Sequence, residues 1–228
     1  MDAVDSTNSW LLEHGTEAGE VICALHQTAG RGRSGRVWQD RPGDSLMFTV
    51  LLPELSPGRL PAAQIVAGYA VVDALLPYAD VRMKWPNDAV IQGCKLSGML
   101  IETRFSGNSL AKAVLGIGIN ICAVPPGMED AAALSAYCGD LPSHGVLLAE
   151  LVNSLRIKFD EFSEGLDVAE EWPLYSANYG KIVSFNKFGR KFSAKELGIT
   201  AEGYIITEGA SGTPEINSMG EIGYDFGA

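Results

Sequence analysis

The sequence is poor in three features that define particular classes of protein: paired cysteines, basic charge and long apolar runs. Its four cysteines, Cys23, Cys94, Cys122 and Cys138, are scattered without a C-x-x-C pair, and there are only three histidines. This spacing argues against a structural zinc site or a disulfide framework and favours reduced thiols. Glycine, proline or charge interrupts every apolar stretch well before the length of a membrane span. With no recognisable signal peptide, we expect a cytoplasmic protein that does not bind membranes.

Basic residues are also few. The chain has 17 Lys and Arg against 28 Asp and Glu, which gives a formal net charge of -11. An acidic surface disfavours nonspecific attraction to nucleic acid or to an anionic membrane, so we expect neither as a partner. The length of 228 residues suits one sizeable domain with a small appendage.

Against this acidic background, arginines gather in one glycine-rich segment, residues 30–40. The segment holds three glycines and three arginines followed by a tryptophan: Gly30, Arg31, Gly32, Arg33, Gly35, Arg36 and Trp38. Glycine lets a backbone approach a ligand closely, arginine suits carboxylate or phosphate, and tryptophan can cover an apolar ring. The pattern predicts a loop that closes over a small, flat anion and stays poorly ordered until an anion neutralises the arginines. A solvated basic turn would have the same composition.

A second polar segment, KWPND at residues 84–88, ends a predicted strand. Pro86 stops the sheet and turns the next polar groups outward. Lys84 can offset phosphate charge, and Asp88 can hold a hard cation or accept a proton. A charged strand end with a proline stop would show the same residues without any function.

A third segment, KLSG at residues 95–98, opens an otherwise apolar strand. Alternation predicts Lys95, Ser97 and Met99 on one face and Gly98 on the other, where a ligand can approach the backbone. A lysine that protects a sheet edge is the alternative. The strand segment GIGIN at residues 116–120 predicts a floor for a flat ring, with Asn120 as donor and acceptor. It does not match the dinucleotide fingerprint.

Tight turns between short apolar runs predict an antiparallel sheet. Strands are expected at residues 21–27, 45–52, 81–85, 89–91, 95–103 and 110–121. Helices are expected after the N-cap residues Ser6-Thr7-Asn8 and at residues 61–76, 128–138, 146–162 and 168–177. After Tyr179, short strands at residues 181–186, 190–196, 204–207 and 221–226 predict a small β-barrel-like appendage.

In their order along the chain, these motifs resemble the biotin protein ligase family, also called biotin–[acetyl-CoA-carboxylase] ligases. The resemblance rests on Ser6-Thr7-Asn8, on Gln27 with the glycine–arginine segment, and on KWPND, KLSG and GIGIN. It implies an α+β fold. Residues 1–179 would form a catalytic domain similar to class II aminoacyl-tRNA synthetases, with a mixed, largely antiparallel sheet, and residues 180–228 an SH3-like β-barrel. Because the Ser-Thr-Asn motif begins at residue 6, the short type without an N-terminal DNA-binding domain is expected.

The family resemblance also implies a two-step reaction. Biotin and ATP with Mg²⁺ give biotinyl-5′-AMP and pyrophosphate, and the biotinyl group then passes to a lysine of a biotin carboxyl carrier protein. The expected cofactors are therefore ATP and Mg²⁺, with biotin as the substrate. The expected partner is a carrier domain, and a homodimer is possible in this family.

Site roles follow from the same resemblance, residue by residue. Biotin would contact Ser6, Thr7, Asn8, Gln27, Gly30, Arg31, Gly32, Arg33, Lys95 and Gly98. The nucleotide would contact Arg31, Arg33, Trp38, Lys84, Asn87 and Asn120. The catalytic set would be Lys84, Asp88, Lys95 and Arg33, with Asp88 as a possible Mg²⁺ ligand.

Three other interpretations remain open at this stage. A lipoate or octanoate–protein ligase would share the fold and the adenylation chemistry, although the glycine–arginine segment is of the biotin type. A non-catalytic biotin sensor would keep the pocket but would not need Lys95, Arg33 and Asp88. A thiol function of Cys94 competes with its simpler role as a small residue in a turn.

Overall fold

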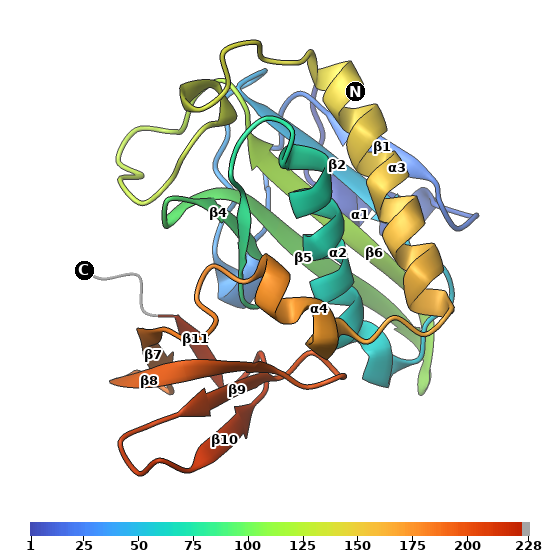
Figure 1. Ribbon diagram of the computed structural model, residues 1–228. Coiled ribbons are helices and arrows are strands. Elements are labelled where there is room, and N and C mark those ends of the chain that lie inside the picture. Colours follow the sequence, from blue (N-terminus) through green and yellow to red (C-terminus); the bar gives the residue numbers. More distant parts are fainter. Residues whose placement is uncertain (225–228) are drawn as a thin grey trace.

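Two antiparallel sheets organise residues 1–224, the part of the chain that this computed structural model describes (Figure 1). The larger sheet has six strands in the order β1-β2-β6-β5-β4-β3, and the smaller has five in the order β10-β9-β8-β7-β11. The strands of the larger sheet are β1 (Val21–Ala24), β2 (Ser45–Leu51), β3 (Arg82–Lys84), β4 (Asp88–Ile91), β5 (Cys94–Ser106) and β6 (Ser109–Asn120). The α+β class and the largely antiparallel pairing predicted from the sequence are confirmed.

Short turns connect the consecutive strands of the larger sheet. Gln92 and Gly93 form the two-residue turn between β4 and β5, and both have positive φ, at 51° and 86°. Two adjacent left-handed residues match the right-handed twist of a hairpin. Gly107, with φ of 60°, makes the turn between β5 and β6. The turns predicted at both glycines are therefore present.

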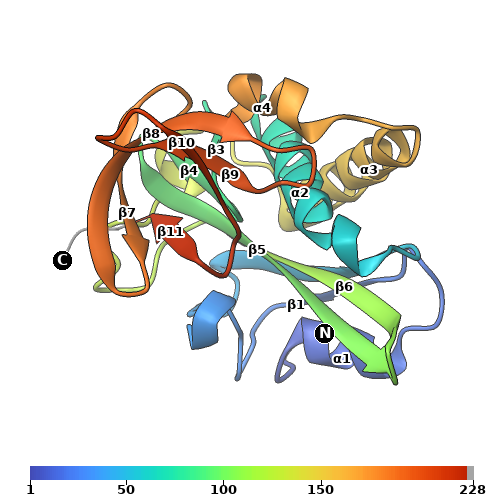
Figure 2. The ribbon, with the colours of Figure 1, turned by 90° about the horizontal axis from the view of Figure 1, so that it is seen from below.

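Helices cover the two faces of the larger sheet differently. Helix α2 (Leu60–Leu75) is apolar nearly all round and lies between the sheet and helix α3 (His144–Ser163). The main core, which includes Phe48, Ile65 and Tyr69, forms there. Helix α1 (Thr7–His14) packs on the opposite face against β2 and β6 (Figure 2). Only part of that second face is covered, which leaves room for a site beside α1.

The prediction of a helix at residues 128–138 is wrong. Only Leu134–Ala136 forms a short 3₁₀ turn, and the preceding residues run extended beside β5. The backbone N–H of Lys95 donates to the carbonyl of Asp130 at 2.7 Å, and the N–H of Ala132 donates to the carbonyl of Lys95 at 2.8 Å. Pairing with a strand edge satisfies backbone groups that an isolated alanine-rich helix would have to satisfy internally.

The smaller sheet follows helix α4 (Val168–Tyr175). Its strands are β7 (Ile182–Lys187), β8 (Arg190–Ile199), β9 (Ile205–Glu208), β10 (Pro214–Asn217) and β11 (Ile222–Tyr224). The sequence did not predict β10, and residues 225–226 of the last expected strand lie outside the described residues. The boundary after residue 179 and the SH3-like character of this part stay predictions.

A buried carboxylate ties the smaller sheet to α4. Glu196 on β8 is fully buried, and its side chain accepts hydrogen bonds from Trp172 Nε1 at 2.8 Å, from Ser176 Oγ at 2.6 Å and from the Tyr224 hydroxyl. Each donor offsets part of the cost of removing the carboxylate from water. The contact fixes the position of Tyr224 at the end of β11.

None of the helices within residues 1–224 combines the length and the apolar character that crossing a membrane requires.

We predict that Gly203→Ala destabilises the fold more than Gly189→Ala. Both glycines have positive φ, 89° and 81°, so alanine costs about 1 kcal/mol of backbone strain at either position. At Gly203 a Cβ would also lie 2.9 Å from the backbone of Pro61, whereas Gly189 faces open space. The clash adds about 1–3 kcal/mol. Urea unfolding of both variants measures the difference, and equal losses would contradict the packing of Gly203 on Pro61.

Candidate functional site

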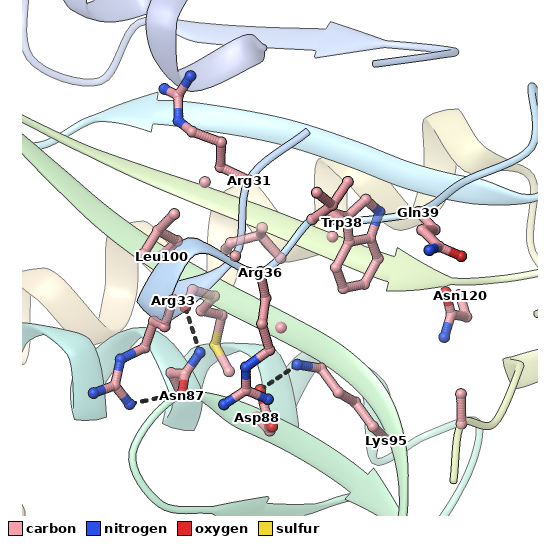
Figure 3. A pocket seen from close by; sticks show the side chains of 18 of the residues that line it. Arg31, Arg33, Arg36, Trp38, Gln39, Asn87, Asp88, Lys95, Leu100 and Asn120 are labelled. Atoms are coloured by element: carbon pink, nitrogen blue, oxygen red, sulfur yellow. Dashed lines mark hydrogen bonds and ion pairs between the residues drawn. The ribbon is translucent and has the colours of Figure 1, made fainter. Parts of the chain in front are cut away.

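A cavity of about 410 Å³ lies on the α1 side of the larger sheet and gathers nearly all of the predicted site residues. Those that line it are Ser6, Thr7, Asn8, Gln27, Arg31, Gly32, Arg33, Trp38, Asn87, Asp88, Lys95, Gly98 and Asn120. Gly30 and Lys84 do not belong to the lining. Segments separated by more than 100 residues of chain thus converge on one hollow, as the close view in Figure 3 shows.

Short polar side chains form one end of the cavity. Both the backbone N–H and the hydroxyl of Thr7 donate to Gln27 Oε1, at 2.9 and 3.1 Å. Thr49 Oγ1 lies 2.8 Å from Thr7 Oγ1 and 2.6 Å from Asn8 Oδ1, and Ser6 caps the N-terminus of α1. This end offers donors and acceptors in a largely buried setting, which suits an uncharged polar ligand group.

The glycine–arginine segment folds back on itself over the cavity. The N–H of Gly32 donates to the carbonyl of Arg36 at 2.8 Å, and the N–H of Trp38 donates to the carbonyl of Gly30 at 3.0 Å. A Cβ on Gly30 would lie 2.9 Å from the Trp38 carbonyl oxygen, so only glycine permits this close pairing. Gly30 therefore shapes the loop and does not line the cavity.

Arg33 fastens the loop to two other parts of the chain. Its Nη1 donates to Asn87 Oδ1 at 3.2 Å, and its Nη2 donates to the carbonyl of Met219, in the turn before β11. Burial lowers the pKa of the guanidinium, and the carboxylate of Asp88 acts in the opposite direction. Figure 3 shows Arg33 and Arg36 reaching toward Asn87 and Asp88, whereas Arg31 points away from them.

Lys95 and Asp88 form an ion pair inside the cavity, with Nζ 2.7 Å from Oδ1. The predicted alternation of faces along this strand is wrong at Lys95. The pairing of β4 with β5 skips Leu96, since Ala89 lies opposite Ser97 and Val90 lies opposite Lys95. A bulge of one residue reverses which face the preceding side chain occupies. A Cβ on Gly98 would consequently lie 3.1 Å from Lys95 Nζ, so both residues face the cavity.

The glycine floor is present, and the indole of Trp38 lies on it. A Cβ would lie 2.6 Å from the indole ring at Gly118 and 3.2 Å from it at Gly98. Within the described part of the chain, Trp38 Nε1 is buried without a hydrogen-bond partner. Asn120 Nδ2 donates to the carbonyl of Ala132 at 3.2 Å. This end of the cavity therefore has a flat aromatic side chain whose N–H is buried and unpaired.

Lys84 lies outside this cavity, beside a smaller hollow of about 260 Å³. Its ammonium nitrogen is 5.1 Å from the centroid of the Tyr224 ring, and burial lowers its pKa. Lys84 lies opposite Asp88 in the β3–β4 pair. Its side chain lines the smaller hollow together with Val183, Ser184 and Tyr224 of the smaller sheet. The role near phosphate that the family resemblance implies for Lys84 stays a prediction.

The cavity also contains residues that the motifs did not single out. Glu102 on β5, residues 127–131 and the end of β11, Gly223 and Tyr224, all line it. A carboxylate within an otherwise apolar strand is a sequence signal for Glu102. No local signal exists for Tyr224, which reaches the cavity only because the smaller sheet packs there. Among residues 1–224, no three His, Cys, Asp or Glu side chains come together to hold a metal ion.

Comparison with known proteins agrees with this geometry. The model of the biotin/lipoate A/B protein ligase family matches residues 1–120. The chain is 30% identical to a biotin–[acetyl-CoA-carboxylase] ligase of Paracoccus denitrificans, over 91% of this chain and 92% of that protein. It is 27% identical to the bifunctional ligase/repressor BirA of Bacillus subtilis, over 96% of this chain and 70% of that protein. The structure of the Aquifex aeolicus biotin protein ligase with biotin and ATP matches with a TM-score of 0.83 and 27% identity, over 99% and 97% of the two chains.

We predict that Gly118→Ala displaces the indole of Trp38 from the floor. The added Cβ would meet the ring at 2.6 Å, and a surface loop moves more easily than the sheet. We expect faster acrylamide quenching of the Trp38 emission and a loss of unfolding free energy below about 1 kcal/mol. The Trp38→Phe variant shows how much of the emission comes from the other tryptophans, so that the Trp38 emission can be identified. Gly139→Ala, at a glycine that faces open space, is the control. Unchanged quenching would contradict the contact.

Proposed function

Because the chain belongs to the biotin/lipoate A/B protein ligase family, we propose that it activates biotin with ATP to biotinyl-5′-AMP and transfers the biotinyl group to a specific lysine of a biotin carboxyl carrier protein. The observation that carries this proposal is the convergence of the predicted motifs on one cavity with a polar end, a cationic centre and an aromatic floor. Relatives across nearly the full length of the chain bear the name of such ligases.

The polar end suits the ureido group of biotin. Thr7 donates to Gln27, and Thr49 contacts both Thr7 and Asn8, so the orientation of these side chains does not have to be created on binding. Ser6 lines the same end. A ureido group presents one carbonyl and two N–H groups, and a site with fixed donors and acceptors rejects ligands that lack them.

Lys95 is the residue proposed to bind the biotin carboxylate. Its ammonium lies inside the cavity, close enough to Gly98 that a Cβ there would be 3.1 Å from Nζ, and its present partner is Asp88. The first step brings a carboxylate oxygen to the α-phosphorus of ATP, forms a P–O bond and releases pyrophosphate. Two anions must approach each other, and Lys95, Arg33 and Arg36 supply positive charge at that place. No side chain acts as nucleophile.

The nucleotide is assigned to the floor and the loop. Trp38 supplies an aromatic ring in the cavity wall, and Asn120 also lines the cavity. Arg33, held by Asn87 and the Met219 carbonyl, lies where the phosphates would be. The loop would exclude water from the mixed anhydride until the amine of the carrier lysine attacks the acyl carbon and AMP leaves.

The residues present fit a magnesium ion that arrives with ATP. Magnesium is held by one or two carboxylates together with substrate phosphates, and it neutralises phosphate charge when bound. Asp88 is a carboxylate in the cavity wall, and Glu129 and Asp130 also line it. We assign Asp88 as the ligand from this chain.

The proposal extends to organisation and partners. The catalytic domain would comprise residues 1–179 and an SH3-like domain residues 180–228, with the smaller sheet supplying Tyr224 to the site. The protein partner is the carrier domain and not nucleic acid, in keeping with a net charge of -11. We further propose a cytoplasmic location, which suits four free cysteines.

We predict that the purified protein releases pyrophosphate when given biotin, ATP and Mg²⁺, and then labels one lysine of a carrier domain. Reactions without biotin, without ATP, or with lipoate replacing biotin are the controls. Activation of lipoate but not of biotin would assign the lipoate branch of the family. Tight biotin binding without pyrophosphate release would mark the protein as a sensor.

We also predict that Lys95→Ala raises the KM for biotin about ten- to a hundredfold. A charge-assisted hydrogen bond in a partly desolvated site contributes roughly 1.5–3 kcal/mol, and 1.4 kcal/mol corresponds to a factor of ten. Lys195→Ala, at an exposed position of the smaller sheet, is the control. Unchanged biotin affinity and adenylation rate in a folded variant would exclude contact between Lys95 and the substrate.

A further inference from the structure

The wall of the cavity contains a carboxylate, which by itself would disfavour the binding of an anionic ligand. Glu102 lies on β5, lines the cavity and keeps 26% of its side chain exposed. Biotin and ATP both carry negative charge, and an unpaired carboxylate among them would repel either one. The contacts of Glu102 show how the chain avoids this repulsion.

Arg31 neutralises Glu102 through two parallel hydrogen bonds. Its Nε donates to Oε1 at 3.1 Å, and its Nη2 donates to Oε2 at 3.0 Å. Such paired contacts between guanidinium and carboxylate fix direction as well as distance. The first arginine of the loop therefore has an anionic partner within the chain. In Figure 3, Arg31 points away from Arg33 and Arg36.

Glu102 holds a second site residue at the same time. Asn8 Nδ2 donates to Glu102 Oε2 at 2.8 Å and lies 3.3 Å from the carbonyl of Leu100. Asn8 Oδ1 accepts from Thr49 Oγ1 at 2.6 Å, so both ends of this buried amide are held. A chain of hydrogen bonds runs from β2 through α1 to β5 and ends on the loop.

We propose that Glu102 is a positioning residue of the ligase, one that fixes Asn8 and Arg31 and so builds the polar end of the cavity before substrate arrives. This inference rests on the proposed function. Because Arg31 and Glu102 cancel each other, positive charge is concentrated at the Lys95 end. Biotin is thereby directed with its ureido ring toward Asn8 and its carboxylate toward Lys95. Without Glu102, an unpaired Arg31 would attract the carboxylate to the wrong end.

The kinetic test uses Glu102→Gln, Arg31→Gln and the double variant, with Glu164→Gln at an exposed position on the end of α3 as control. We expect Glu102→Gln to raise the KM for biotin at least tenfold in pyrophosphate release, while the KM for ATP changes less than threefold. kcat should also stay within threefold, because the reacting atoms lie at the Lys95 end. The double variant should be no worse than the poorer single variant, since removing both partners leaves no unpaired charge.

Three outcomes would overturn the proposal. They are additive effects of the two substitutions, a fall in kcat with the KM for biotin unchanged, and no change in either constant. Should Glu102→Gln not fold, Glu102→Asp keeps the charge but shortens the reach, and we expect it to raise the KM for biotin with kcat retained. The free energy of unfolding of each variant separates loss of fold from loss of position.

A second measurement does not depend on activity. Trypsin cleaves after arginine. The sequence alone predicts a loop that is poorly ordered without a ligand, whereas the contacts of Arg31 with Glu102 and of Arg33 with Asn87 lead us to expect slow cleavage at residues 31–36 in the free protein. We expect Glu102→Gln to speed cleavage in this loop at least fivefold over wild type and over Glu164→Gln. Equal cleavage would show that Glu102 does not order the loop. If the wild-type protein released no pyrophosphate, the proposed function would fail, and this comparison would still test the contact between Glu102 and Arg31.

Discussion

The whole site depends on three glycines of the larger sheet that let other side chains lie against the backbone. A Cβ on Gly116 would lie 2.2 Å from Asn8 Oδ1, one on Gly118 would meet the Trp38 ring, and one on Gly98 would meet Lys95. These glycines let α1, the arginine loop and the start of β5 approach the same face of β5 and β6. Side chains at Gly116 and Gly118 would clash with Asn8 and Trp38, so the cavity could not keep its present shape.

Positively charged side chains surround the cavity, although the chain as a whole has a net charge of -11. Three cations of the cavity have a specific partner within the fold: Lys95 pairs with Asp88, Arg31 with Glu102, and Arg33 with Asn87 and the Met219 carbonyl. Paired cations are positioned before a ligand arrives, and a substrate anion has to exchange with an existing contact. Preorganised charge of this kind stabilises a developing charge without the cost of rearranging solvent.

The errors of sequence interpretation share one cause. The alanine-rich residues 128–138 have helical propensity, but the edge of β5 offered their backbone a better set of partners. Strict alternation predicted Lys95 and Gly98 on opposite faces of the strand, but the bulge at Leu96 places both on the same face. In both cases pairing with another strand outweighed a local preference.

By itself the sequence determined the α+β class, the positions of most strands and helices, the family resemblance and thirteen of the residues that line the cavity. These features follow from local periodicity, turn chemistry and short motifs, which the chain carries wherever it folds. Only the tertiary structure decided that Arg31 faces Glu102, that Trp38 lies on the glycine floor and that Tyr224 closes the wall. These contacts join residues far apart in the chain, 71 positions for Arg31 and Glu102, and their geometry depends on sheet register and on packing between the two sheets.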